Sequence, residues 1–169
     1  MINSPSRVIS DVLCSLRIRS KEWNSRLIEK PRLLIVGGPN GSGKTTIAKQ
    51  YAAAEDVPYI GADEIAASLQ PAAPDLARME AGRQFIRSVV QSISNRQSCV
   101  VESTLSGRSI RNNILSASDS GFEITIVFVF VDSADVCVAR VAERVRKGGH
   151  DVPEQDIRRR FRRSINNFW

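Results

Sequence analysis

The sequence contains few of the residues from which disulfides, metal sites and base-stacking surfaces are built. Of its 169 residues three are cysteine and one is histidine, and aromatic residues make up 6%. Cys14, Cys99 and Cys137 lie far apart and form no CxxC motif. This usage predicts reduced, mostly buried thiols in a cytosolic protein rather than a disulfide framework. The few aromatic residues also argue against a surface that stacks nucleic-acid bases.

Long apolar runs are missing as well. No run approaches the roughly 20 residues that a membrane-spanning helix needs, and polar residues interrupt the N-terminal segment too often for a signal peptide. We therefore expect a cytoplasmic protein without a membrane partner. Hydrophobic residues at 42% and charged residues at 25% are ordinary proportions for a soluble globular domain. The chain is long enough for one domain with a sizeable core.

Positive charge is concentrated towards the end of the sequence. The formal net charge is +6, and residues 140–163 hold nine Lys/Arg against four Asp/Glu. The rest of the chain holds fifteen basic and fourteen acidic residues and is nearly neutral. A local basic excess in a neutral domain predicts a site for concentrated negative charge, such as the phosphates of a nucleotide or of nucleic acid.

Apolar patterning alternates between strand and helix along the chain. Residues 1–30 have the spacing of an N-terminal amphipathic helix, which either packs on its own domain or docks a partner. Residues 31–169 are expected to form one domain, and the long β-branched run 122–131 is predicted to be its central strand. The alternation predicts an α/β fold, a three-layer sandwich around a mostly parallel sheet. The other strands are expected within 32–38, 57–61 and 98–104, and helices within 43–54, 62–69, 75–94, 108–121, 133–149 and 152–169.

A glycine-rich turn follows the first predicted strand and opens the first predicted helix. It fits the pattern G-x-x-x-x-G-K-[ST] at every fixed position. In such a P-loop, backbone N–H groups and the helix N-terminus hold phosphate, the lysine reaches the β- and γ-phosphates, and the threonine hydroxyl binds Mg²⁺. The predicted binding residues for a nucleotide such as ATP are Gly38, Pro39, Asn40, Gly41, Ser42, Gly43, Lys44, Thr45 and Thr46, with Thr45 also the metal ligand.

Two carboxylates stand just beyond predicted strands, where ligands of parallel sheets bind. Asp63 can accept a proton from a hydroxyl that attacks the γ-phosphoryl group, or it can cap the helix that follows; spacing leaves both readings open. Glu102 can organise Mg²⁺ through water or bind substrate, and a partner is expected for it because burying an unpaired carboxylate is costly. Ser103 and Thr104 bind substrate or merely shape the turn.

The basic segment contains a glycine pair, Gly148 and Gly149, between two arginine-rich helical stretches. This arrangement favours a hinged lid, about residues 144–160, whose guanidiniums close over the γ-phosphate. The alternative is a pair of solvated basic helices. His150 lies in the presumed lid turn, where a role in turn geometry is favoured over catalysis. Ser133 is expected to cap the helix that leads into this segment.

Taken in order, these pieces resemble the zeta-toxin / UDP-N-acetylglucosamine kinase family of P-loop kinases. The matching stretches are GPNGSGKTT, GADEIA, EAGR, VESTLSG and VAERVRKGGHDVPEQDIRRRFRRSINN. The resemblance implies transfer of the γ-phosphoryl group of ATP, with Mg²⁺, to the 3'-hydroxyl of the amino sugar of UDP-N-acetylglucosamine. It also implies an antitoxin protein as a partner.

The resemblance assigns roles position by position. Asp63 is implied as the general base, which raises that reading above the capping one. Lys44 and Thr45 bind phosphate and Mg²⁺, Glu102 and Thr104 contact the sugar nucleotide, and Arg83 lines the substrate side. Among the lid arginines Arg146 and Arg159 are preferred as catalytic, with Arg144 and Arg160 close behind as ATP-binding residues.

The sequence departs from the family pattern in three places. Gly61 stands where the family usually has Asn, which removes a side-chain contact, and Ser103 stands where it usually has Thr. Trp169 ends the sequence within the helix after the lid, so the family's final strand is expected to be lacking. Besides a kinase, two other functions stay open: a nucleotide-dependent module that binds nucleic acid, which the composition disfavours, and a degenerate P-loop protein acting through a partner.

Overall fold

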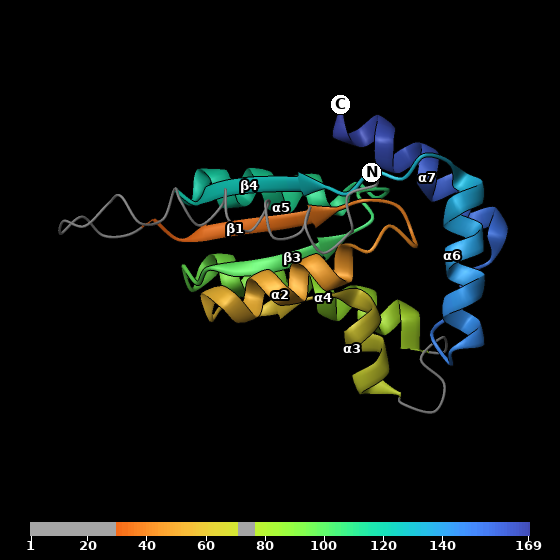
Figure 1. The fold of residues 1–169 in the computed structure, drawn as a ribbon. Coiled ribbons are helices and arrows are strands. Elements are labelled where there is room, and N and C mark those ends of the chain that lie inside the picture. The colour runs from red at the N-terminus through yellow and green to blue at the C-terminus, as the bar shows by residue number, and fades with distance from the viewer. Residues whose placement is uncertain (1–29, 71–76) are drawn as a thin grey trace.

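A four-stranded parallel sheet forms the centre of the protein. The computed structural model describes residues 30–70 and 77–169. Within them the strands are β1 (Arg32–Gly37), β2 (Tyr59–Ile60), β3 (Cys99–Ser103) and β4 (Glu123–Phe128). Their order across the sheet is β2-β3-β1-β4, and every adjacent pair is parallel (Figure 1).

Helices follow the strands and cover both faces of the sheet. Leu33 and Ile35 of β1 point to one face, whose hydrophobic cluster includes Phe85 and Val89. Leu34 and Val36 point to the other face, where Ala48 and Ala52 pack. The predicted three-layer α/β sandwich is therefore confirmed. The described helices are α2 (Lys44–Glu55), α3 (Ala62–Leu69), α4 (Arg78–Ser94), α5 (Ser109–Asp119), α6 (Ala134–Arg146) and α7 (Glu154–Phe168).

The prediction of a central strand over residues 122–131 was wrong. Among the described strands β4 lies at the edge, it ends at Phe128, and β1 is its only neighbour. Ile126 is 40% exposed, whereas Ile35 of β1 is fully buried. A β-branched run favours a strand, but its place in the sheet depends on how many neighbours cover it. Beyond Phe128 the chain turns to run beside the P-loop, where Val129 N donates to Gly37 O at 2.8 Å.

The elements that carry the site stand at the carboxyl ends of the strands. There α3 projects from the sheet, and α6 and α7 form a separate helical pair (Figure 1). Cys137 and Val141 of α6 pack with Val152 and Ile157 in their own hydrophobic cluster. Ser133 caps α6 as predicted, since its side chain accepts a hydrogen bond from Val136 N at 3.3 Å.

Some predictions fall outside the described residues. They are the N-terminal helix, except for Lys30, the state of Cys14, and the first two residues of the helix expected over 75–94; α4 accounts for residues 78–94 of that helix. Cys99 and Cys137 are free and buried, as predicted. Among the described helices none has the length and apolar content to cross a membrane.

Candidate nucleotide and acceptor site

The P-loop wraps tightly before α2. Gly43 immediately precedes the helix with φ of 91°, a left-handed conformation that disfavours any side chain. Asn40 and Ser42 are buried, and Asn40 Oδ1 and Ser42 Oγ have no hydrogen-bond partner in the described part of the chain. Buried polar atoms are normally satisfied, so a loop with two orphaned side-chain oxygens fits the role of a ligand cradle.

Lys44 is buried at the first position of α2. Its Nζ donates to Pro39 O at 3.2 Å and lies 3.6 Å from Glu102 Oε1. Burial lowers the pKa of Lys44, and the carboxylates of Glu102 and Asp63 act against that shift. The lysine therefore sits between the loop that would hold phosphate and the end of β3.

Glu102 has the partner that the sequence argument expected, and in fact two. Besides Lys44 it accepts a hydrogen bond from Tyr59 Oη at 2.5 Å. Burial and this hydrogen bond raise the pKa of Tyr59, which keeps the phenol a donor. Sequence reasoning missed Tyr59, because the contact joins residues 43 positions apart and no local pattern marks it.

Asp63 lies in the first turn of α3, after the end of β2. The helix begins at Ala62, and its N-cap residue is Gly61, without a side-chain capping bond. The capping interpretation of Asp63 was therefore wrong. Its carboxylate is exposed and lies within electrostatic range of Lys44 and Arg160.

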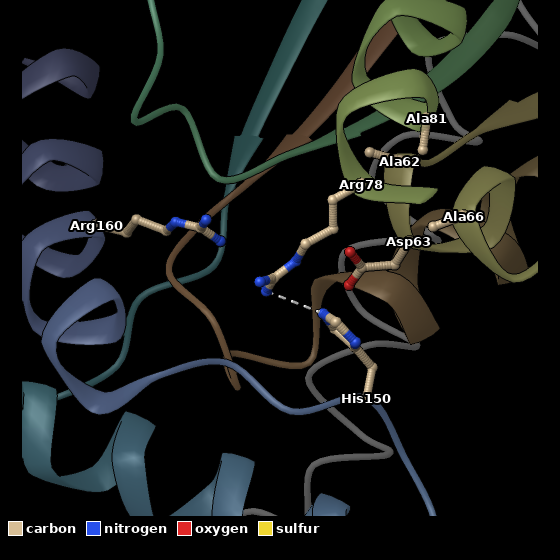
Figure 2. A pocket seen from close by; sticks show the side chains of 7 residues that line it. All are labelled: Ala62, Asp63, Ala66, Arg78, Ala81, His150 and Arg160. Carbon is tan, nitrogen blue, oxygen red and sulfur yellow. Dashed lines mark hydrogen bonds between the residues drawn. The ribbon is translucent and has the colours of Figure 1, made fainter. Parts of the chain in front are cut away.

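An open pocket of about 200 Å³ lies between α3, the start of α4, the turn between α6 and α7, and α7 itself. Figure 2 shows the side chains of Arg78, Arg160 and His150 around the same space as Asp63. Arg78 Nη2 lies 3.3 Å from His150 Nε2 and donates to Asp151 O at 3.5 Å, so α4 is tied to the lid turn. Sequence reasoning missed Arg78, and small residues form the rest of the wall: Ala62, Ala66 and Ala81.

The four arginines predicted to act in a lid lie in two different environments. Arg144 is half-buried near Lys44, donates to His150 O at 2.6 Å and keeps a buried Nε without a partner in the described residues. Arg160 lines the pocket, and burial lowers its pKa. Arg146 is 74% exposed and pairs with Glu143, and Arg159 pairs with Asp156 at 2.9 Å.

The remaining predicted residues are spread around the site. Thr45 and Thr46 are exposed in the first turn of α2. Thr104 follows β3, with Oγ1 2.8 Å from Ser106 Oγ. Arg83 lies on α4 and forms an ion pair with Glu80 at 2.8 Å, at an exposed position that does not line the pocket.

The donor set fits a nucleotide with Mg²⁺. Orphaned oxygens, a buried lysine and Arg144 surround the loop, and the Thr45 hydroxyl is exposed at the helix start. No group of three or more His, Cys, Asp or Glu residues in the described ranges is placed so that it could hold a metal ion. That pattern is compatible with Mg²⁺, which proteins bind through few ligands together with substrate phosphates.

Comparison with known proteins places this geometry in a family. Residues 33–164 match the family described as AAA domain (AAA_33). The chain belongs to this AAA domain family. An uncharacterised protein of Haemophilus influenzae is 31% identical over 144 residues, which are 85% of this chain and 99% of that protein.

Solved structures share the fold at lower identity. The Pnkp1/Rnl/Hen1 RNA repair complex matches with a TM-score of 0.67 and 19% identity over 87% of this chain and 48% of that chain. The PezAT toxin–antitoxin system of Streptococcus pneumoniae matches with a TM-score of 0.57 and 17% identity over 86% and 64%. A gluconokinase from Sinorhizobium meliloti matches with a TM-score of 0.51 and 20% identity over 82% and 75%. This AAA domain protein therefore has the α/β fold of P-loop kinases.

Proposed function

We propose that this protein is an ATP-dependent kinase that phosphorylates a hydroxyl group, and that its acceptor is the 3'-hydroxyl of the amino sugar of UDP-N-acetylglucosamine. The observation that carries the kinase proposal is a carboxylate beside the P-loop lysine, since Asp63 lies within electrostatic range of Lys44. Arg144 also lies within range of Lys44, and Arg160 lines the pocket beside Asp63. A carboxylate in this place can take the proton of an acceptor hydroxyl, which a passive nucleotide binder does not need. The acceptor itself rests on the sequence resemblance.

Each proposed residue has a separate role in one reaction, the displacement of ADP from the γ-phosphorus by the acceptor hydroxyl. A bond forms between the acceptor oxygen and the γ-phosphorus, the bond from that phosphorus to the ADP oxygen breaks, and the hydroxyl proton passes to the Asp63 carboxylate. Lys44 and the guanidiniums of Arg144 and Arg160 offset the negative charge on the phosphoryl oxygens. Mg²⁺, held by Thr45 together with the phosphates, supplies further neutralisation when bound.

The lid turn supplies a means to exclude water. Arg144 donates to the His150 carbonyl, and His150 contacts Arg78 of α4, so the turn after α6 bridges the acceptor side and the nucleotide side. A bridge of this kind favours transfer to the acceptor over hydrolysis.

The decisive experiment is mass spectrometry of UDP-N-acetylglucosamine incubated with the protein, ATP and Mg²⁺. Wild type is expected to yield a product heavier by one phosphoryl group, and Asp63→Asn is expected to lower the rate by about 100-fold or more, because general-base catalysis contributes 10²–10⁴-fold. Glu64→Gln is the matched control, since Glu64 is the next residue of α3 and pairs with exposed Lys49.

The other outcomes separate the parts of the proposal. Transfer to gluconate or to an oligonucleotide 5'-hydroxyl, without transfer to the sugar nucleotide, would retain the kinase and replace the acceptor. Equal rates for Asp63→Asn and wild type would remove Asp63 as the base. An antitoxin partner is proposed from the same resemblance, and co-purification of the chain with the product of a neighbouring gene would test it.

A further inference from the structure

A chain of contacts runs from β2 to the P-loop lysine. Tyr59 Oη donates to Glu102 Oε2, and Glu102 Oε1 lies 3.6 Å from Lys44 Nζ. The side chains of Lys44 and Glu102 are only 8% and 11% exposed. Both charges therefore depend on each other and on their polar neighbours, because burying an uncompensated charge costs several kcal/mol.

Gly61 makes room for this arrangement. A Cβ at position 61 would lie 2.2 Å from Tyr59 Oη and 2.6 Å from Tyr59 Cζ. The backbone at Gly61 is extended, with φ of −136°, so any residue could adopt its conformation. Glycine is therefore needed here for space: the phenol occupies the volume that a side chain at position 61 would fill.

Nucleotide binding changes the electrostatic surroundings of Glu102. A phosphate group at the P-loop interacts with the positive charge of Lys44, and in the free protein that charge compensates Glu102. Tyr59 is a second, uncharged donor to the same carboxylate, and it reaches Glu102 from β2 rather than from the P-loop. With the phenol in place, Glu102 keeps a hydrogen bond when Lys44 turns to phosphate.

We propose that Tyr59 is a positioning residue for nucleotide binding, which acts through Glu102 to make Lys44 available to phosphate. This inference rests on the proposed nucleotide site and adds a residue that neither the P-loop pattern nor the family resemblance assigns. Gly61 contributes to the same arrangement, because the absence of a side chain at position 61 lets the Tyr59 phenol reach the Glu102 carboxylate.

The test is isothermal titration calorimetry of ATP and ADP with Mg²⁺ on the full chain. Tyr59→Phe is expected to weaken nucleotide binding about tenfold, because the hydrogen bond to Glu102 is present with and without nucleotide and only its larger contribution in the bound state is lost. Gly61→Ala is expected to weaken it in the same direction, because the new methyl group displaces an intact Tyr59 from Glu102. This second variant retains the phenol and every core residue.

Two matched controls address packing and folding. Tyr51→Phe removes a phenol hydroxyl on α2 whose charged neighbours, Glu55, Arg32 and Glu123, lie away from the P-loop. Gly82→Ala adds a methyl group in α4 where, apart from its chain neighbours and the backbone of its own helix, no atom lies within 4 Å. Both controls are expected to bind nucleotide as wild type does, and melting temperatures confirm that all variants are folded.

A double-mutant cycle distinguishes positioning from a structural effect. In a Glu102→Gln background the carboxylate charge is gone, so Tyr59→Phe is expected to change nucleotide affinity less than threefold. An undiminished loss in that background, or unchanged affinity of Tyr59→Phe beside a binding wild type, would overturn the inference while leaving the proposed function intact. Wild type that binds no nucleotide would overturn both.

Discussion

Arg144 and Arg146 are two positions apart on α6 and therefore face different sides of it. Arg144 lies three residues after Val141 and seven after Cys137, both buried, so it continues their stripe towards the P-loop. Arg160 likewise shares the stripe of Ile157 and Ser164 on α7. The arginines that extend an apolar stripe face inward. Their spacing from the buried residues of the same helix could have been read from the sequence.

The stripe leads to a prediction about the lid arginines. Arg144→Ala is expected to lower kcat/KM for phosphoryl transfer by about 100-fold or more, since a guanidinium at the phosphoryl group contributes 10³–10⁵-fold in related chemistry. Arg146→Ala removes an exposed ion pair with Glu143 and is expected to change the rate less than about threefold. Steady-state kinetics of both variants compare the two directly, and the reverse order would favour the preference drawn from the sequence alone.

Contacts between residues that lie far apart in the sequence could not be predicted from the sequence. Lys44 and Asp63 were selected as candidates because a local pattern or a strand end marks them. Tyr59 was not found, because its partner Glu102 belongs to another strand and its neighbour Gly61 was read as a lost contact. The roles of all the predicted site residues stay predictions, those of Lys44 and Asp63 included.

Elements were predicted well where local chemistry decides them. Helix α6 begins after Ser133, which caps it, and α7 begins after Pro153. The position of β4 was mispredicted, because the pattern of residues 122–131 records strand propensity and not the number of neighbouring strands. The local sequence determines the type of an element and where it begins and ends. The strands that lie next to it depend on the arrangement of the whole sheet.

The capping contact gives a prediction at the scale of the element. Ser133→Ala removes the acceptor for Val136 N and is expected to lower the free energy of unfolding by about 1 kcal/mol. Ser133→Asp keeps an acceptor at that position and is expected to retain the stability of wild type or exceed it. Urea denaturation measures both, and equal stability of Ser133→Ala and wild type would mean that the cap contributes nothing measurable.

At the scale of the whole molecule, nucleotide binding and the stability of the fold are linked. A nucleotide that binds only the folded chain at 100 times its dissociation constant is expected to add about 2.7 kcal/mol to the free energy of unfolding and to raise Tm. Lys30→Ala, which removes an exposed lysine before β1, is expected to keep this increase, and Lys44→Ala is expected to lose it. Thermal melts with and without ATP and Mg²⁺ provide the measurement, and an increase that survives Lys44→Ala would contradict the P-loop assignment.

The three alanines that join α3 to α4 have a consequence for how this protein can be changed. Ala66, Ala77 and Ala81 form a small hydrophobic cluster, and Ile65 packs both against it and against the cluster on one face of the sheet. Effects on stability do not simply add when substituted residues share a packing partner. A protein engineer who enlarges or recharges the wall around Asp63 therefore has to measure the stability of the sheet core and the state of the P-loop as well, because Ile65 connects the alanines to that core and Asp63 lies within electrostatic range of Lys44.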